Sequence, residues 1–214
     1  MRYINVSSLI AILMLTGAVT AAGQNWLIVP GQSVGPISRS TSEKELIKIF
    51  GARNVRRRAI DVGEGETEQG TIIFQNDPRR KASILWSDAS RQRPKSISIT
   101  NKNTLWKTDR GITIGTPLTM IEELNGRPFV LMGFGWDYSG TVIHSNGGRV
   151  GELGTLSGEE IVNRTLLLRL EPRFALQKTR EFNDVNGEKE FFSNNPAMKK
   201  LNPRVYELTV EFSP

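Results

Sequence analysis

The stretch from Thr116 to His144 reads TPLTMIEELNGRPFVLMGFGWDYSGTVIH, and most of its pattern occurs once before, from Thr41 to Phe74. Similar residues recur 75 positions apart, namely Thr41 and Thr116, Leu46 and Ile121, Ile49 and Leu124, Gly51 and Gly126, and Val55 and Val130. A later pair of strings, Gly70-Thr71-Ile72-Ile73 and Gly140-Thr141-Val142-Ile143, matches 70 positions apart. The sequence therefore predicts one supersecondary unit used twice, with a connection five residues shorter in the second copy.

The first copy is predicted to be a helix followed by a four-stranded antiparallel meander. Ser42 and Glu45 have the spacing of a capping box, which satisfies two backbone N–H groups at the start of a helix. Gly51 can end this helix because glycine accepts the left-handed conformation without steric cost. Apolar or alternating stretches separated by turn residues then predict four strands, at 55–60, 70–75, 82–87 and 95–100.

The second copy is predicted to have the same plan. Thr116 is expected to be the N-cap of its helix, with Pro117 at the first helical position and Gly126 at the end. Its first two strands are expected at 129–134 and 140–144, and its last two at the late alternating stretches 165–171 and 204–212.

Two insertions separate the late strands from the rest of the second copy, roughly at 145–164 and 172–203. The second insertion is polar and is expected to have little secondary structure, so it is read either as a disordered segment or as a lid. The predicted fold class is α+β, with two tandem repeats of a helix plus a four-stranded antiparallel meander forming a joined sheet. The repeats span 41–110 and 111–214, behind a leader strand and linker at 23–40.

Composition excludes several kinds of site. The chain of 214 residues has no cysteine, which rules out disulfides, thiolate catalysis and thiolate metal ligands. Its one histidine, His144, corresponds to Phe74 in the repeat, so a packing role is favoured over chemistry. A Ser-His-Asp triad or a histidine-based zinc site lacks the residues it would need. No catalytic residue, metal or cofactor is therefore expected.

Residues 1–22 have the features of an export signal. Arg2 is positive, residues 9–19 are apolar, and small residues at 20–22 allow cleavage after Ala21 or Ala22. The apolar run is shorter than the ~20 residues that a spanning helix needs. The expected product is periplasmic or secreted and does not span the membrane after cleavage.

The net charge of +6 raises the question of an acidic partner. Basic residues are densest at 56–58, 79–81 and 91–95, which could form a patch for nucleic acid or another anionic surface. Acidic residues such as Glu64, Glu66 and Asp88 are interspersed with them, which is typical of a solvated surface. Export also argues against a nucleic-acid partner, and none is predicted.

The most specific string in the chain is GFGWDYSG, at 133–140. Glycines around a tryptophan and a tyrosine indicate tight turns that present large amphipathic rings, which suit a binding surface. In the other interpretation Phe134 and Trp136 are core residues beside a glycine bulge, and Asp137 caps a turn. The candidate partner-binding residues are Phe134, Trp136, Asp137 and Tyr138, with Trp86 from the first repeat.

At the level of the repeat, the chain resembles the beta-lactamase-inhibitor-protein family, which implies tandem units of a helix plus a four-stranded sheet. The string GTPLTMIEELNGRP is similar to the small outer-membrane lipoproteins of the barrel-assembly machinery, and FGWDYSG resembles a family of exported bacterial proteins of unassigned function. The resemblance covers about residues 35–144 and, by inference, the two late strands. The chain lacks the inhibitors' disulfide cysteines and the lipoproteins' lipid-carrying cysteine, so no functional residue is carried over.

Three functions are compatible with these observations. The leading hypothesis is a non-enzymatic protein-binding module of the bacterial envelope, whose partner is an envelope or secreted protein. The rival is a hydrolase that acts on an envelope polymer through carboxylates such as Asp137 and Glu123. The third is a structural envelope component without a discrete site.

Overall fold

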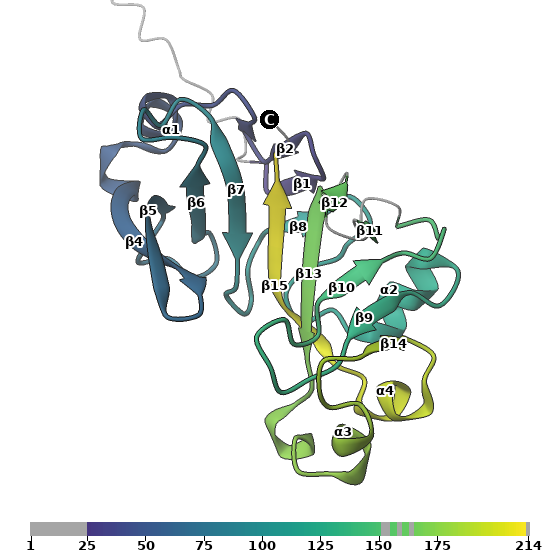
Figure 1. Ribbon diagram of the computed structural model, residues 1–214. Coiled ribbons are helices and arrows are strands. Elements are labelled where there is room, and N and C mark those ends of the chain that lie inside the picture. The colour runs from purple at the N-terminus through teal and green to yellow at the C-terminus, as the bar shows by residue number, and fades with distance from the viewer. Residues whose placement is uncertain (1–24, 151–154, 158–159, 163–164, 213–214) are drawn as a thin grey trace, which may run out of the picture.

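The computed structural model describes residues 25–150, 155–157, 160–162 and 165–212, so the expected signal at 1–22 lies outside the described residues. The α+β class is confirmed, because helices and mainly antiparallel sheets form one after another along the chain (Figure 1). The helices are α1 (Glu43–Phe50), α2 (Leu118–Asn125), α3 (Arg180–Asp184) and α4 (Pro196–Leu201), with 3-10 turns at Ala52–Asn54 and Phe174–Leu176.

The largest sheet has six strands in the order β13-β15-β7-β6-β5-β4, and all of its neighbours are antiparallel. Its strands are β4 (Val55–Gly63), β5 (Glu66–Ile73), β6 (Ala82–Trp86), β7 (Pro94–Ile99), β13 (Leu166–Glu171) and β15 (Arg204–Glu211). One face of this sheet carries the core, with Ile73, Ile84 and Ile97 fully buried, and α1 adds Leu46 and Phe50 to the same core. The opposite face carries the alternate residues, because side chains alternate along a strand.

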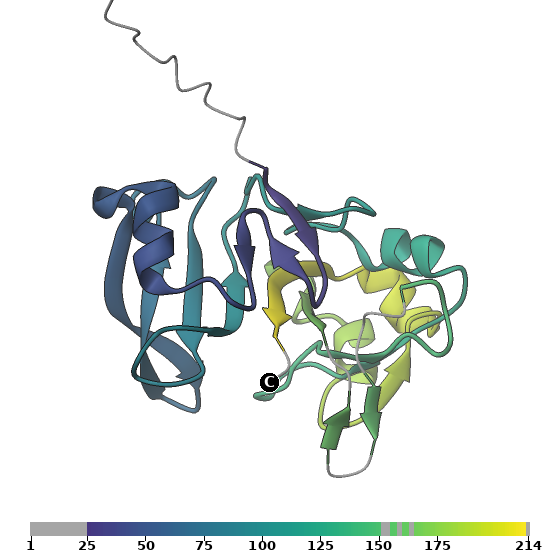
Figure 2. The ribbon, with the colours of Figure 1, turned by 90° about the horizontal axis from the view of Figure 1, so that it is seen from above.

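Three smaller sheets complete the described part of the chain. The leading strands β1 (Leu27–Val29), β2 (Ser33–Val34) and β3 (Ile37–Ser38) form a sheet in which β1 also pairs in parallel with β8 (Lys107–Thr108). Figure 2 shows this sheet between the lobe that contains α1 and the part that contains α2 and α4. The others are β10 (Val142–His144), β9 (Val130–Met132) and β14 (Glu190–Phe192), and the hairpin of β11 (Thr155–Ser157) and β12 (Glu160–Val162).

The joined sheet of two equivalent meanders is not confirmed. The late strands β13 and β15 do extend the sheet of the first repeat, because β15 pairs with β7. However, β9 and β10 lie in a separate sheet whose third strand, β14, comes from the second insertion. Between β10 and β13 the structure has a single bridge, from Thr141 to Arg169.

The two long helices begin differently. Ser42 caps α1 with the predicted capping box, since its hydroxyl accepts from Glu45 N and the Glu45 carboxylate accepts from Ser42 N. The prediction that Thr116 caps α2 is wrong, because Pro117 occupies that position without a side-chain bond. The Thr116 hydroxyl turns back and accepts from Thr113 N at 2.9 Å, so it is not available to the helix. Thr41 accepts from Ser38 N in the same way, also at 2.9 Å.

The insertion at 172–203 was expected to have little structure, and that expectation is wrong. It contains a 3-10 turn, α3, β14 and α4. The sequence signal was Asn195-Pro196, because Asn195 accepts from Ala197 N as an N-cap and proline stands at the first helical position. Tertiary pairing, here of β14 with β9, supplies the rest of its order.

A buried carboxylate ties α1 to the six-stranded sheet. Trp86 Nε1 donates to Thr71 Oγ1 (2.9 Å), and that hydroxyl donates to Glu43 Oε1 (2.7 Å). Arg57 Nε donates to Glu43 Oε2 at 3.0 Å, and Arg91 lies within 3.9 Å of the carboxylate. Burial alone would raise the pKa of the Glu43 carboxyl, but the hydrogen bonds from Arg57 and Thr71 and the charges of Arg57 and Arg91 together lower it below 4.5.

Replacing this carboxylate should lower stability in a pH-dependent way. At neutral pH, Glu43→Gln should reduce the free energy of unfolding by about 1–3 kcal/mol, because the buried Thr71 hydroxyl and the Arg57 guanidinium lose a charged acceptor. The folded-state pKa is lowered, so this contribution is fully present above the unfolded value near 4.5 and is lost as the pH falls through the folded value. Urea denaturation at neutral and acidic pH measures both effects. Glu123→Gln, on the exposed face of α2, is the control, and an equal loss in both variants would contradict the role of Glu43.

Candidate partner-binding surface

Two of the five predicted binding residues belong to the core. Trp86, on β6, is 3% exposed, and its indole N–H donates a hydrogen bond to Thr71 Oγ1. Phe134 is 1% exposed and stacks on Phe182 with ring centroids 5.9 Å apart. Neither Trp86 nor Phe134 therefore offers the exposed ring surface that the prediction required. Trp86 shares the buried face of β6 with Ile84, because side chains two positions apart lie on the same side of a strand.

The other three residues lie together at the surface, in the loop that joins β9 to β10. Tyr138 is 56% exposed, Asp137 is exposed and Trp136 is half-buried. The Trp136 ring meets the Tyr138 ring edge to face, with centroids 5.3 Å apart, and its N–H donates to the Gly133 carbonyl (3.1 Å). The two rings are therefore held against each other, which lowers the entropy they would lose on binding.

The glycines of this loop are required by close backbone contacts. At Gly140, where φ is +65°, an added Cβ would lie 1.8 Å from the Leu170 carbonyl oxygen of β13. At Gly133 it would lie 2.5 Å from the Gly187 carbonyl oxygen, in the segment before β14. The loop is thus pinned between β13 and the second insertion, and Trp136 and Tyr138 are the large side chains left to face outward.

Arg169, on β13, connects the loop to the six-stranded sheet. Its guanidinium donates to the Asp137 carbonyl, pairs with the Glu207 carboxylate at 3.5 Å and lies over the Tyr206 ring at 5.4 Å. Sequence reasoning did not select Arg169. The alternation of leucines along 165–171 indicated only that it faces away from the core, and its partners are distant in sequence.

The face of the six-stranded sheet that turns away from the core forms a groove of about 570 Å³, here called the open-face groove. All six strands contribute to its lining, which comprises Ala59, Ile60, Asp61, Val62, Gly63, Ile72, Ser83, Leu85, Ser96, Ser98, Thr100, Leu167, Arg169, Glu207 and Thr209. Ile72, Ser83, Ser98, Thr209 and Leu167 stand in one cross-strand row. Within the row, Ser98 and Thr209 share a hydroxyl–hydroxyl bond of 2.7 Å.

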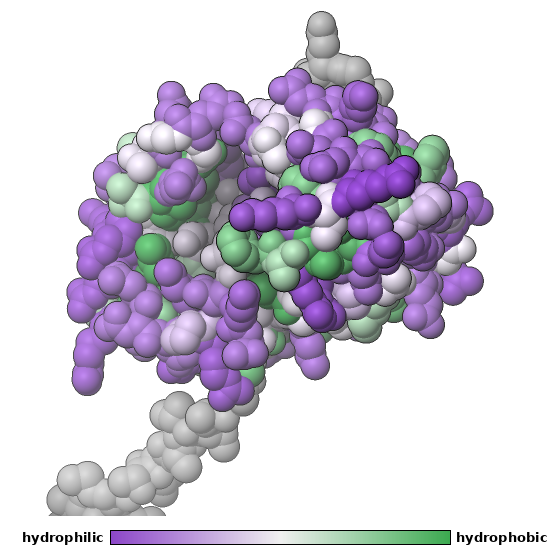
Figure 3. All heavy atoms as spheres, turned by 90° about the horizontal axis from the view of Figure 1, so that it is seen from below, coloured by the Kyte–Doolittle hydropathy of each residue, from purple (hydrophilic) through white to green (hydrophobic). Residues whose placement is uncertain are grey.

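The exposed loop forms part of the rim of this groove. A smaller hollow of about 230 Å³ lies between Asp137 and Tyr138 on one side and the β4–β5 hairpin tip on the other, and it shares Arg169 with the open-face groove. Seen from below in Figure 3, the surface is hollowed beside the lobe of β4–β7, with hydrophobic atoms in the hollow and hydrophilic atoms around it. The predicted loop and the sheet face therefore make one composite surface.

The carboxylates proposed for hydrolysis are not brought together in a groove. Asp137 lies at the rim just described, whereas Glu123 is exposed on α2 and lines none of the grooves described here. In the part of the chain that the structure describes, no group of three acidic or histidine side chains could hold a metal ion. His144 Nδ1 accepts from Asn146 N at 3.2 Å, as part of a turn.

Comparisons with protein-family models, with curated proteins and with solved structures gave no match to this chain. Within the described residues, none of the helices has the length and apolar character needed to cross a membrane.

The close approach at Gly140 predicts a large loss of stability on adding one methyl group. Gly140→Ala should cost more than about 3 kcal/mol, because it combines left-handed strain with a clash against the β13 backbone. Gly65→Ala is the matched control, since Gly65 also has positive φ (+77°) but open space around it, and it should cost about 1 kcal/mol. Denaturant midpoints of both variants measure the difference, and equal costs would mean that the loop is not pinned to β13.

Proposed function

We propose that this chain is a non-enzymatic protein-binding module of the bacterial envelope that holds its partner on the open-face groove. The observation that carries the proposal is the groove itself, a hollow lined by all six strands of the largest sheet. A sheet gives such a surface rigidity, because backbone hydrogen bonds hold its strands to one another.

The chemistry of the groove suits a protein better than a small polar substrate. Half-buried aliphatic side chains, such as Ile72, Leu85 and Leu167, alternate with hydroxyls that can each donate and accept. Arg169 adds one positive charge, and Asp61 and Glu207 add two negative charges. At the rim, Trp136 and Tyr138 offer ring surface with a polar end, the kind of residue that is enriched in protein interfaces.

We also infer that the two helix-and-strand segments arose as copies of one unit, which is why the beta-lactamase-inhibitor-like fold is proposed. Three matched pairs support the inference. Thr41 and Thr116 form the same side-chain bond at 2.9 Å, Leu46 and Ile121 are both fully buried, and Gly51 and Gly126 end their helices with positive φ. A periplasmic or secreted location and cleavage after Ala21 or Ala22 remain part of the same proposal.

Capture from the native periplasm tests the proposed docking face. Trp136→Ala combined with Tyr138→Ala should preserve the fold and abolish retention of the partner, because the rim loses the half-buried Trp136 ring and the exposed Tyr138 ring. Ser83→Arg, in the middle of the open-face groove, should do the same by filling it.

The matched control is Ile47→Arg, which places the same charge on the exposed side of α1, the helix that covers the other face of the sheet. Circular dichroism and the denaturant midpoint establish that each variant is folded. Retention of the same protein by all four versions of the chain would refute the docking face. The absence of any retained protein for the wild type would instead favour a structural component without a discrete site.

A further inference from the structure

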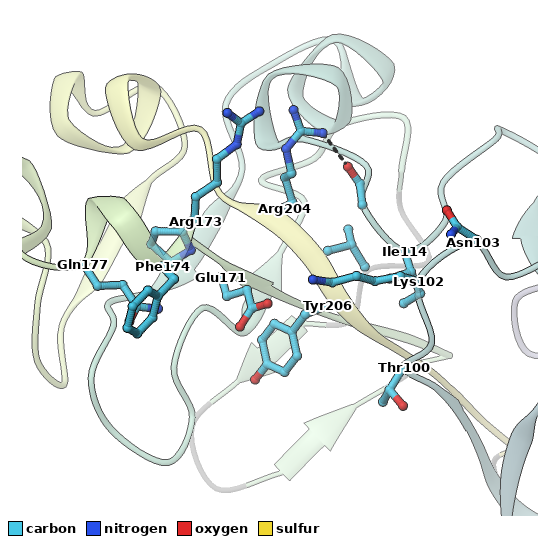
Figure 4. A pocket seen from close by; sticks show the side chains of 13 residues that line it. Thr100, Lys102, Asn103, Ile114, Glu171, Arg173, Phe174, Gln177, Arg204 and Tyr206 are labelled. Carbon is cyan, nitrogen blue, oxygen red and sulfur yellow. Dashed lines mark hydrogen bonds between the residues drawn. The ribbon is translucent and has the colours of Figure 1, made fainter. Parts of the chain in front are cut away.

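A second groove, which adjoins the open-face groove at Thr100, lies where the two halves of the chain meet (Figure 4). Its volume is about 680 Å³, within the range of sites that bind ligands. It is built from four segments, namely the end of β7 and the turn after it, the turn before α2, the chain after β13, and the start of β15. We call it the Tyr206 groove, after the ring at its centre.

The lining of the Tyr206 groove combines an apolar floor with an exposed aromatic ring. Val205 is buried and Ile114 is partly buried, and both pack into the core below the groove. Phe174 stands at its edge and is 83% exposed. A phenylalanine exposed to this extent does not gain the favourable free energy of burying its ring. Because Phe174 stands beside a groove, we infer that a ligand covers the ring.

The charge of the Tyr206 groove is predominantly positive. Lys102, Arg173 and Arg204 line it, against the single carboxylate of Glu171. Figure 4 shows Arg173 and Arg204 extending in the same direction at one end, while Lys102 and Glu171 reach toward the Tyr206 ring. Arg204 is held in place by a bond of 2.9 Å to the Gly115 carbonyl. Among the described residues, Lys102 and Arg173 have no carboxylate at ion-pair distance, so both charges are available to a ligand.

We propose that the Tyr206 groove binds an acidic segment of another protein, in which an apolar side chain lies next to the carboxylates. The two arginines match carboxylates in geometry as well as in charge, and the apolar side chain would rest on the partly buried Ile114, with Phe174 at the edge of the groove. A continuation of the groove leads from Tyr206 past Gln177 to Trp136, so the segment would run toward the exposed loop. An acidic glycan would meet the same positive charges and rings, but it carries no apolar side chain to cover Ile114 and Phe174, so a peptide segment fits better.

Fluorescence anisotropy with a defined peptide tests this proposal on the whole chain. The probe is a labelled peptide of repeated Glu-Glu-Phe, and the comparison peptides are Lys-Lys-Phe and Glu-Glu-Ser repeats of the same length. The Glu-Glu-Phe peptide should bind saturably and lose affinity with added salt, and both comparison peptides should bind at least about tenfold more weakly.

Variants locate the binding site. Lys102→Ala with Arg173→Ala should weaken binding of the Glu-Glu-Phe peptide at least about tenfold, and Phe174→Ser should weaken it by roughly fivefold. The matched control, Lys44→Ala with Arg58→Ala, removes the same charge from exposed positions outside the groove and should change little. Ser83→Arg should also leave peptide binding unchanged, so failure of the open-face proposal and failure of this one can be told apart.

Three outcomes would overturn the proposal. The first is equal binding of the acidic and basic peptides. The second is an equal loss in the control variant, which would mean that only the net charge acts. The third is displacement of the peptide by polygalacturonate at lower concentration, which would assign the groove to an acidic glycan.

Discussion

The pairing of β15 with β7 is the constraint on which both grooves depend. It places Thr209 opposite Ser98 and Leu208 opposite Ile99, so residues more than a hundred positions apart share one row of the sheet. Without this pairing the strands of the first half would end at β7, and the open-face groove would lose Leu167, Arg169 and Glu207. The Tyr206 groove would lose its centre as well, because Tyr206 and Arg204 reach it only through β15. Since Leu208 and Val210 are fully buried on the other face, the hydrophobic core fixes the pairing register.

Local patterns in the sequence predicted much of the fold. These patterns depend on neighbours within a few residues, so the sequence alone predicts them. They are the capping box of Ser42 and Glu45, the helix-ending glycines, and the alternation in β6, β7, β13 and β15. What the sequence could not supply was the choice of partner strand. The helix-and-meander pattern is compatible with one sheet or with several. No local sequence signal predicted that β14, from the second insertion, pairs with β9.

The candidate site was predicted only in part, for a related reason. The GFGWDYSG string correctly indicated a tight loop, and its glycines are now explained by the β13 backbone and the segment before β14. Whether each ring faces inward or outward depends on the elements that pack against it. Phe134 is covered by Phe182, which belongs to the insertion, and Trp86 is engaged by the Glu43 network. The residues that join the loop to the sheet, Arg169 and Glu207, meet only after the chain has folded.

The position of β15 also affects how the chain folds during synthesis, which begins at the N-terminus. β13 ends at Glu171 and β15 begins at Arg204, yet β15 lies inside the sheet, between β13 and β7. Until β15 arrives, β7 keeps an unpaired edge with Ile97 and Ile99 beside it, and β13 has no strand to join. Such an edge is a template for association with other chains. An emerging chain of this topology is therefore most exposed to association with other chains while the insertion before Arg204 is being delivered.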